Sequence, residues 1–214
     1  MLVRERMTPN PITVTEDTSM HDALRLMRER RIRRLPVVDR QGNLIGMVSE
    51  KDLLYASPSP ATSLSVFEIN YLISQIKVGQ LMNREPITIE EDCPLEEAAR
   101  IMADSRVSGL PVMRAGKLVG IITETDLFKI FLELLGARER GLRLTLLVPN
   151  RRGMLASLTG TISSLGGDIV TLGTFNGAEP GKGLITIKVR DVDRQKLLEA
   201  LPGLGVEVVD VREA

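Results

Sequence analysis

The chain has 214 residues, of which 43% are hydrophobic and 26% are charged, as is usual for a globular protein of one or two domains. Lysine and arginine together number 28, as do aspartate and glutamate, and this balance argues against a dedicated nucleic-acid binder. With one cysteine and one histidine, the chain cannot form an internal disulfide or a zinc site built from several such ligands.

The first 135 residues contain one pattern twice, with copies 74 or 75 positions apart. The matching phrases are "MTPNPITV" (7–14) with "MNREPITI" (82–89), and "GMVSEKDL" (46–53) with "GIITETDL" (120–127). In each copy an extended segment at 11–14 or 86–89 precedes a helix, because apolar residues recur at i, i+3, i+4 and i+7 from Met20 and from Leu95. Two strands joined by a glycine turn follow, and the second phrase begins another helix. The pattern predicts β-α-β-β-α twice.

Between the copies, residues 57–63 have the composition of a loop, and residues 64–76 show helical spacing of apolar residues. Beyond residue 138 the pattern changes to β-α-β-β-α-β, which is typical of a ferredoxin-like α+β fold. The expected strands are 142–148, 168–175, 184–190 and 206–211, and the expected helices are 155–165 and 193–201.

The hydroxyl and carboxylate residues of the second phrase have two interpretations. Ser49 with Asp52, and Thr123 with Asp126, have the spacing of a helix cap, in which the acidic residue bonds back to the cap. The same groups also suit a nucleotide, because a helix N-terminus and a hydroxyl favour phosphate while an aspartate accepts ribose hydroxyls. The glycine before each pair would let a flat base approach the backbone. Arg31 and Arg106, which lie just before the "LPV" strands at 35–37 and 110–112, would bind phosphate through their guanidinium groups.

The two copies resemble tandem CBS domains, the Bateman module, whose adenosyl-ligand motif Gly-x-x-Ser/Thr-x-x-Asp both copies carry. The resemblance implies that the hydroxyl residue faces phosphate, that the aspartate binds ribose, that an arginine contacts phosphate and that a threonine of the opening strand lines the base pocket. Carried over to this sequence, the nucleotide-binding residues are Thr13, Arg31, Ser49, Asp52, Thr88, Arg106, Thr123 and Asp126.

Residues 140–214 resemble an ACT domain through "RLTLLVPNRRGMLASLTGTISSLGGDIVTL". In that family the turn after the first strand and the helix that follows hold an amino acid at a dimer interface. Here Asn150 replaces the acidic residue of the usual turn and Arg152 replaces its proline, while Gly153 is kept. The corresponding ligand residues are Asn150, Gly153 and Met154, and a dimerisation lobe without a ligand is an equally good reading.

The expected domains are a first CBS repeat (1–58), a linker helix with the second repeat (59–136) and an ACT domain (140–214). This order also resembles acetoin-utilisation proteins of the AcuB type. We expect a cytoplasmic regulatory protein, not an enzyme, because no catalytic constellation is visible, no apolar run could span a bilayer and no secretory signal follows Met1.

The expected regulatory ligand is an adenine nucleotide (AMP, ADP or ATP) or a related adenosyl compound, with or without Mg²⁺, and there is no catalytic cofactor and no metal site. An amino acid is the expected second ligand. The chain would form a homodimer or larger homo-oligomer and act on a regulated partner protein. The alternatives are an oligomerisation scaffold without a ligand and a DNA-associated regulator that responds to metabolites.

Overall fold

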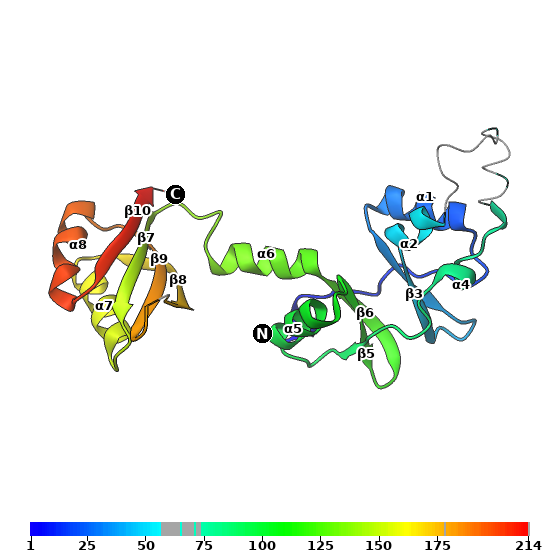
Figure 1. Cartoon of the computed structure of the whole chain (residues 1–214), viewed down its shortest axis with the longest axis horizontal. Helices are drawn as coiled ribbons and strands as arrows, with labels where there is room; N and C mark the ends of the chain where they lie inside the picture. The colour runs from blue at the N-terminus through cyan, green and yellow to red at the C-terminus, as the bar shows by residue number, and fades with distance from the viewer. Residues whose placement is uncertain (57–64, 66–70, 72–73, 178, 214) are drawn as a thin grey trace. The chain divides into compact units, whose positions relative to one another are not determined.

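The computed structural model describes residues 1–56, 65, 71, 74–177 and 179–213. The chain divides into two compact units, Met1–Leu127 and Phe128–Ala214, most of whose elements are labelled in Figure 1. Most of the helix expected at 64–76 lies outside the described residues. None of the helices in the described part of the chain is long and apolar enough to cross a membrane.

The first unit contains both repeats up to the first turn of the last helix, which continues into the second unit, and each repeat has the predicted helix, antiparallel hairpin and second helix. The first repeat consists of α1 (Met20–Arg30), β2 (Arg34–Val38), β3 (Leu44–Ser49) and α2 (Glu50–Tyr55). The second consists of β4 (Ile89–Glu90), α5 (Leu95–Ser105), β5 (Gly109–Arg114), β6 (Lys117–Thr123) and α6 (Glu124–Leu134). Short elements precede them: η1 (Val3–Glu5) and β1 (Thr8–Pro9) before the first, and α4 (Val78–Leu81) before the second.

The opening strand expected at 11–14 is not formed. Pro11 lacks an amide hydrogen, which limits strand pairing at that point. Only Val14 pairs, through a single parallel bridge to Val37 of β2. In the second repeat the opening strand is reduced to β4, which pairs with β5 in parallel. The segments before the two hairpins are therefore more irregular than their alternation suggests.

The segments that precede the repeats are exchanged between them. β1 comes before the first repeat but pairs antiparallel with β6 of the second. α4 comes before the second repeat but binds the first, where the Val78 amide donates to Thr18 O at 2.9 Å. Directly after α4, Asn83 and Met47 of β3 donate backbone hydrogen bonds to each other at 2.8 and 2.9 Å. This exchange joins the two repeats into one unit.

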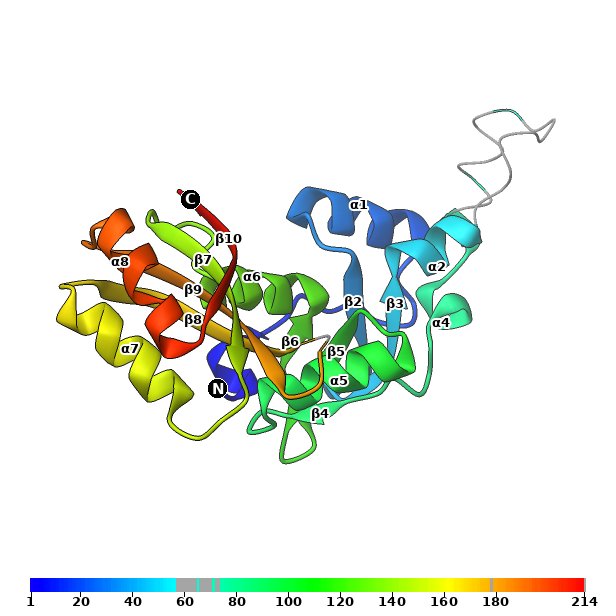
Figure 2. The same cartoon turned by 60° about the vertical axis from the view of Figure 1, so that its left-hand side comes forward.

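The second unit has the predicted order β-α-β-β-α-β. Its strands form one antiparallel sheet in the order β10-β7-β9-β8, which is the split βαβ arrangement. Figure 2 shows α7 and α8 beside this sheet. The elements are β7 (Leu142–Pro149), α7 (Met154–Ser164), β8 (Asp168–Asn176), β9 (Lys182–Arg190), α8 (Arg194–Ala200), η2 (Pro202–Leu204) and β10 (Glu207–Glu213).

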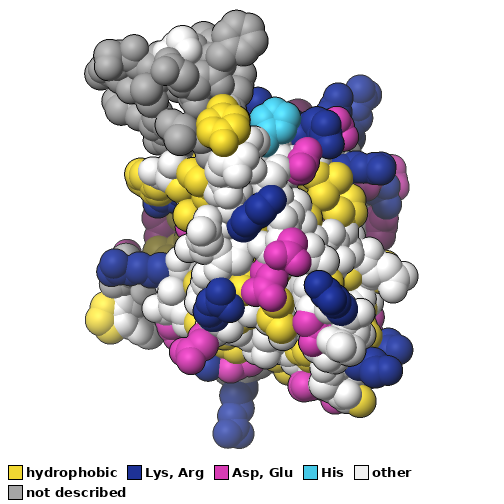
Figure 3. All heavy atoms as spheres, turned by 90° about the vertical axis from the view of Figure 1, so that its right-hand side faces the viewer, with side chains coloured by type: hydrophobic (Ala, Val, Ile, Leu, Met, Phe, Trp, Pro, Cys, Tyr) yellow, Lys and Arg dark blue, Asp and Glu magenta, His cyan; other side chains and the backbone are white. Residues whose placement is uncertain are grey.

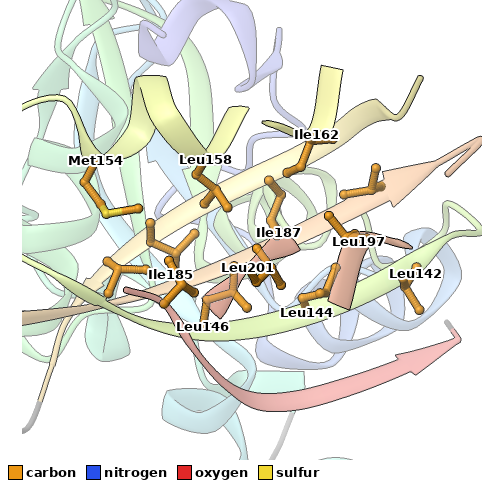
Figure 4. Packing of buried hydrophobic residues seen from close by; sticks show 13 residues of the cluster. Leu142, Leu144, Leu146, Met154, Leu158, Ile162, Ile185, Ile187, Leu197 and Leu201 are labelled. Atoms are coloured by element: carbon orange, nitrogen blue, oxygen red, sulfur yellow. The ribbon is translucent and has the colours of Figure 1, made fainter. Parts of the chain in front are cut away.

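The core of the second unit lies between its sheet and its two helices. Every second residue of β7 is buried, as the sequence predicts for a strand with one face on the core. Figure 4 shows these side chains meeting those of α7, β9 and α8. The buried members are Leu142, Leu144, Leu146, Val148, Met154, Leu158, Ile162, Ile185, Ile187, Val189, Leu197, Leu201 and Val206.

One lysine of this unit is buried beside the end of α6. Lys188 of β9 is 3% exposed, and its ammonium group donates to Gly136 O at 2.9 Å and to Glu139 O at 2.7 Å. Gly136 has a φ of +57°, so it can end the helix in the left-handed conformation that other residues adopt at a cost. The residues after α6 are thereby fixed to β9.

Candidate functional site

The repeated phrase forms the same corner in both repeats, where a hairpin strand ends and a helix begins. In the Ser49 corner (Ser49 to Asp52), the Asp52 amide donates to Ser49 Oγ at 3.2 Å. The Ser49 amide and hydroxyl both donate to Asp52 Oδ2, at 2.9 and 2.6 Å. In the Thr123 corner (Thr123 to Asp126), the Thr123 amide and hydroxyl donate to Asp126 Oδ2 at 3.1 and 2.8 Å. The capping interpretation is confirmed.

The glycine before each corner packs closely against one of the segments that are exchanged between the repeats. A Cβ atom on Gly46 would lie 2.6 Å from Met82 Sδ and 2.9 Å from Asn83 O. A Cβ atom on Gly120 would meet the side chain of Met7 in the same way. On the side where a Cβ atom would project, the exchanged segments therefore fill the space.

Arg31 and Arg106 terminate α1 and α5 in matching conformations. Both have left-handed backbone angles, with φ of 53° and 55°, and both are exposed. Each is followed by an amide that donates to the helix, Ile32 to Met27 O at 2.9 Å and Val107 to Met102 O at 3.0 Å. A left-handed residue at a helix end is usually glycine, since a side chain costs about 1–2 kcal/mol there.

Thr13 and Thr88 occupy matching positions before the first hairpin strand of each repeat. Both are exposed, and each precedes a buried residue, Val14 or Ile89, that pairs with the hairpin. No hydrogen bond within the described part of the chain joins either threonine to the repeated phrase. The structure thus places them in matching segments, and no hydrogen bond within the described residues ties them to the corners.

A cavity of about 570 Å³ opens beside the Ser49 corner. Two arginines that the repeat comparison did not select, Arg33 and Arg34, reach it from the start of β2, whereas Arg31 does not line it. The motif spacing alone gave no sign of this, because the lining comes from both repeats. We call it the arginine cavity; it is lined by Arg33, Arg34, Ser49, Glu50, Lys51, Leu54, Tyr55 and Ser108.

Arg34 is half-buried, and its surroundings lower the pKa of its guanidinium group. Burial lowers the pKa of Arg34 first, and the like charge of Arg33 lowers it further, while Glu124 and Asp52 oppose the shift. Within the described residues neither Arg33 nor Arg34 forms an ion pair. Two adjacent positive charges therefore face a cavity without a bonded carboxylate.

The second unit has a hollow of its own, of about 1080 Å³, between the β7–α7 turn and the β8–β9 hairpin. All three residues expected to bind a ligand there, Asn150, Gly153 and Met154, line it. Gly153 precedes α7 with a φ of +80°, so the turn uses a conformation that favours glycine. The Asn150 amide donates to Gly181 O at 2.8 Å and links the turn to the hairpin.

Charge on the outside of the first unit is mixed. Figure 3, seen from the side of α1 and α2, shows basic and acidic side chains interspersed and not gathered by sign. Ion pairs such as Arg25 with Asp22 at 3.0 Å contribute to this pattern. Among the described residues there is no cluster of three or more histidine, cysteine or acidic side chains that could hold a metal ion.

Comparison with known proteins identifies the family to which the first unit is similar. The family model of the CBS domain matches residues 3–59 and 78–133. The chain is similar to the structure of a protein assigned to acetoin utilization (AcuB) from Vibrio cholerae, with 31% identity and a TM-score of 0.53 over 65% of this chain and 96% of that one.

Two further similar structures contain ligands. The CBS domain pair of protein MJ0100, in complex with 5-methylthioadenosine and S-adenosyl-L-methionine, is 28% identical, with a TM-score of 0.52 over 65% of this chain and 98% of that one. CBSX2 in complex with AMP is 37% identical, with a TM-score of 0.50 over 61% of this chain and 96% of that one.

Proposed function

Since this chain belongs to the CBS-domain family, we propose that it is a regulatory protein that binds an adenine nucleotide or a related adenosyl compound at its two corners. The observation that carries the proposal is the presence of two folded Gly-x-x-Ser/Thr-x-x-Asp corners in one unit. AMP and adenosyl compounds bound to similar CBS pairs support it. The protein senses its ligand, with or without Mg²⁺, and does not convert it.

The proposed contacts follow the chemistry of each side chain. Ser49 and Thr123 face phosphate, and Asp52 and Asp126 accept the ribose hydroxyls; Oδ1 of Asp52 receives no hydrogen bond from the described residues. Arg31 and Arg106 are proposed phosphate ligands, with Thr13 and Thr88 beside the base. The left-handed backbone supports the arginine assignment, because strained positions cluster at functional sites. An arginine where glycine would relax the turn suggests a role for its side chain.

For the second unit we propose an ACT domain over residues 140–214. Its split βαβ topology and the glycine-led turn into α7 support this. The hollow at Asn150, Gly153 and Met154 would then hold a second metabolite such as an amino acid. The likeness to the AcuB protein supports a role in acetoin utilisation. The proposal also includes a cytoplasmic location, a homodimer or larger assembly and a regulated partner protein.

Two alternatives have less support. A ligand-free oligomerisation scaffold would need the corners only as helix caps, which their hydrogen bonds allow. A DNA-associated regulator would need a basic face, and the mixed charges seen in Figure 3 do not provide one on that side.

The test is a thermal-shift panel of AMP, ADP, ATP, S-adenosylmethionine and NAD, each with and without Mg²⁺. A ligand at a hundredfold excess over its dissociation constant stabilises the unit by about 2.7 kcal/mol. We expect Asp52→Asn and Asp126→Asn each to weaken the shift and the double variant to abolish it. A panel in which no adenosyl compound shifts the wild-type protein would reject the proposed function and leave the two alternatives.

The matched control for these variants lies in α1. Ser19 caps this helix as Ser49 caps α2: the Asp22 amide donates to Ser19 Oγ at 3.0 Å, and the Ser19 hydroxyl donates to Asp22 Oδ2 at 2.7 Å. Asp22→Asn perturbs a similar cap outside the corners, so it should lower the melting temperature but leave the ligand shift intact. Equal ligand shifts in Asp22→Asn and in the double variant would show that the corners only cap helices.

A further inference from the structure

The arginine-rich run at residues 28–34 does not recur in the second repeat. "RERRIRR" in the first repeat corresponds to "ADSRVSG" at residues 103–109. Only the fourth position, Arg31 with Arg106, is arginine in both. Arg33 and Arg34 correspond to Ser108 and Gly109, so the repeats differ in charge beside otherwise equivalent corners.

The structure explains why one repeat has glycine where the other has arginine. The side chain of Arg34 lies against Gly109, where a Cβ atom would be 2.9 Å from Arg34 Cδ and 3.2 Å from Nε. The two equivalent positions therefore meet, and there is room for one long side chain. Ser108, the counterpart of Arg33, lines the same arginine cavity. The asymmetry is built into the contact between the repeats.

The charges at the cavity favour an anion. Arg33, Arg34 and Lys51 line it with Glu50, and the carboxylates of Glu124 and Asp52 also lie near enough to act on Arg34. Neither arginine forms an ion pair within the described residues, and each repels the other. Guanidinium groups bind phosphate through paired hydrogen bonds, so an anion would relieve this repulsion. Because Ser49 lines the cavity as well, a ligand at the Ser49 corner can extend into it.

We propose that the arginine cavity is a polyphosphate subsite of the Ser49 corner alone, which makes this corner selective for a nucleoside di- or triphosphate. The Thr123 corner, with serine and glycine at the equivalent positions, takes a monophosphate or an adenosyl compound without a phosphate chain. This inference rests on the proposed function for the identity of the adenosine part. It adds that each chain binds one polyphosphate.

Calorimetric titration of the full chain with AMP, ADP and ATP, each without Mg²⁺, tests this. We expect one site per chain to prefer ADP and ATP over AMP by about tenfold or more. In Arg33→Gln/Arg34→Gln the preference should vanish while the AMP affinity stays within about twofold. The variant Arg33→Ser/Arg34→Gly, which copies the second repeat, should lose the preference for ADP and ATP in the same way. Circular dichroism and melting curves establish that both variants fold.

The matched control is Arg28→Ala/Arg30→Ser, which removes two charges from the same run and also copies the second repeat, but outside the cavity lining. This control variant should keep the preference for ADP and ATP over AMP. Inorganic tripolyphosphate, used alone, should bind the wild-type and control proteins and not the glutamine variant. Two ADP sites per chain, or a preference that survives Arg33→Gln/Arg34→Gln, would overturn the inference and leave the proposed function standing. Failure of every adenine compound, with tripolyphosphate still bound, would reject the proposed function but keep the subsite.

Discussion

At the scale of single residues, Asp39 shows how one carboxylate organises a turn. Between β2 and β3, Asp39 Oδ1 accepts the amides of Gln41 at 2.9 Å and Asn43 at 2.8 Å. Oδ2 accepts the side-chain amide of Asn43 at 2.9 Å. These bonds favour the charged carboxylate, because an ionised oxygen accepts hydrogen bonds more strongly. They hold together the hairpin whose far end contributes Arg34 and Ser49.

The hydrogen bonds predict the pH dependence of this turn. They lower the pKa of Asp39, chiefly through the side chain and amide of Asn43. A carboxyl group whose pKa is lower in the folded protein stabilises it above the unfolded pKa, and this stabilisation is lost as the pH falls through the folded value. We expect the Asp39 carboxyl signal to titrate below the ordinary value of about 3.9 in an NMR experiment. In Asn43→Ala it should titrate closer to that value, and an unchanged midpoint would contradict this account.

Single residues were predictable where their partners are close in sequence. The spacing of Ser49 and Asp52 predicted their cap, because both atoms belong to one helical turn. Arg33 and Arg34 were not selected, since their position in a cavity depends on Ser108 and Gly109 of the other repeat. Repetition favoured Arg31 instead, because its counterpart Arg106 is also arginine.

At the scale of elements, the exchange of segments predicts that Met7 and Gly120 are coupled in their effect on stability. The Met7 side chain lies where Gly120 of β6 leaves space, and the three atoms nearest to a Cβ at that position all belong to Met7. We expect Gly120→Ala to destabilise the protein by about 1 kcal/mol, at the low end for overpacking, because the flexible Met7 side chain can shift. The cost should fall when Met7→Ala is added, since the shorter side chain frees the space. Urea unfolding of the wild type, both single variants and the double variant measures this coupling.

The matched control is a glycine with free space. A Cβ atom on Gly160 of α7 would meet no atom within 4 Å, so Gly160→Ala should stabilise its helix by about 0.5–1 kcal/mol. If Gly120→Ala cost the same with and without Met7→Ala, the contact between the segments would not explain the glycine.

The order of the elements was largely predictable, whereas their pairing was not. Apolar spacing gave α1, α5 and the strands of the second unit, because periodicity reports which face of an element is buried. It could not show that β1 pairs with β6, since the leading segments of the repeats look alike and either partner would satisfy their pattern. The opening strand at 11–14 failed for a local reason, the proline at its start.

At the scale of the whole molecule, the described part of the chain includes two clusters of buried apolar residues that are separate from each other. One lies in the first repeat and includes Val78 and Met82 from the exchanged segment, and the other fills the second unit. The two clusters share no residue. The family match ends at residue 133, so its sequence evidence is confined to the part before the second core. Proteins with separate cores commonly unfold in more than one step.

This organisation predicts two unfolding transitions that respond differently to substitutions in each core and to a bound nucleotide. Leu35 and Leu158 are both 0% exposed, one in each core, and truncation of a buried leucine to alanine costs about 2–5 kcal/mol. In differential scanning calorimetry, Leu35→Ala should lower one transition by several degrees or more and Leu158→Ala the other. AMP should raise the transition that Leu35→Ala lowers and leave the other in place, because the corners belong to the first unit. A single transition that both substitutions shift equally would mean that the two cores unfold as one, and any ligand at the corners would then stabilise the whole chain.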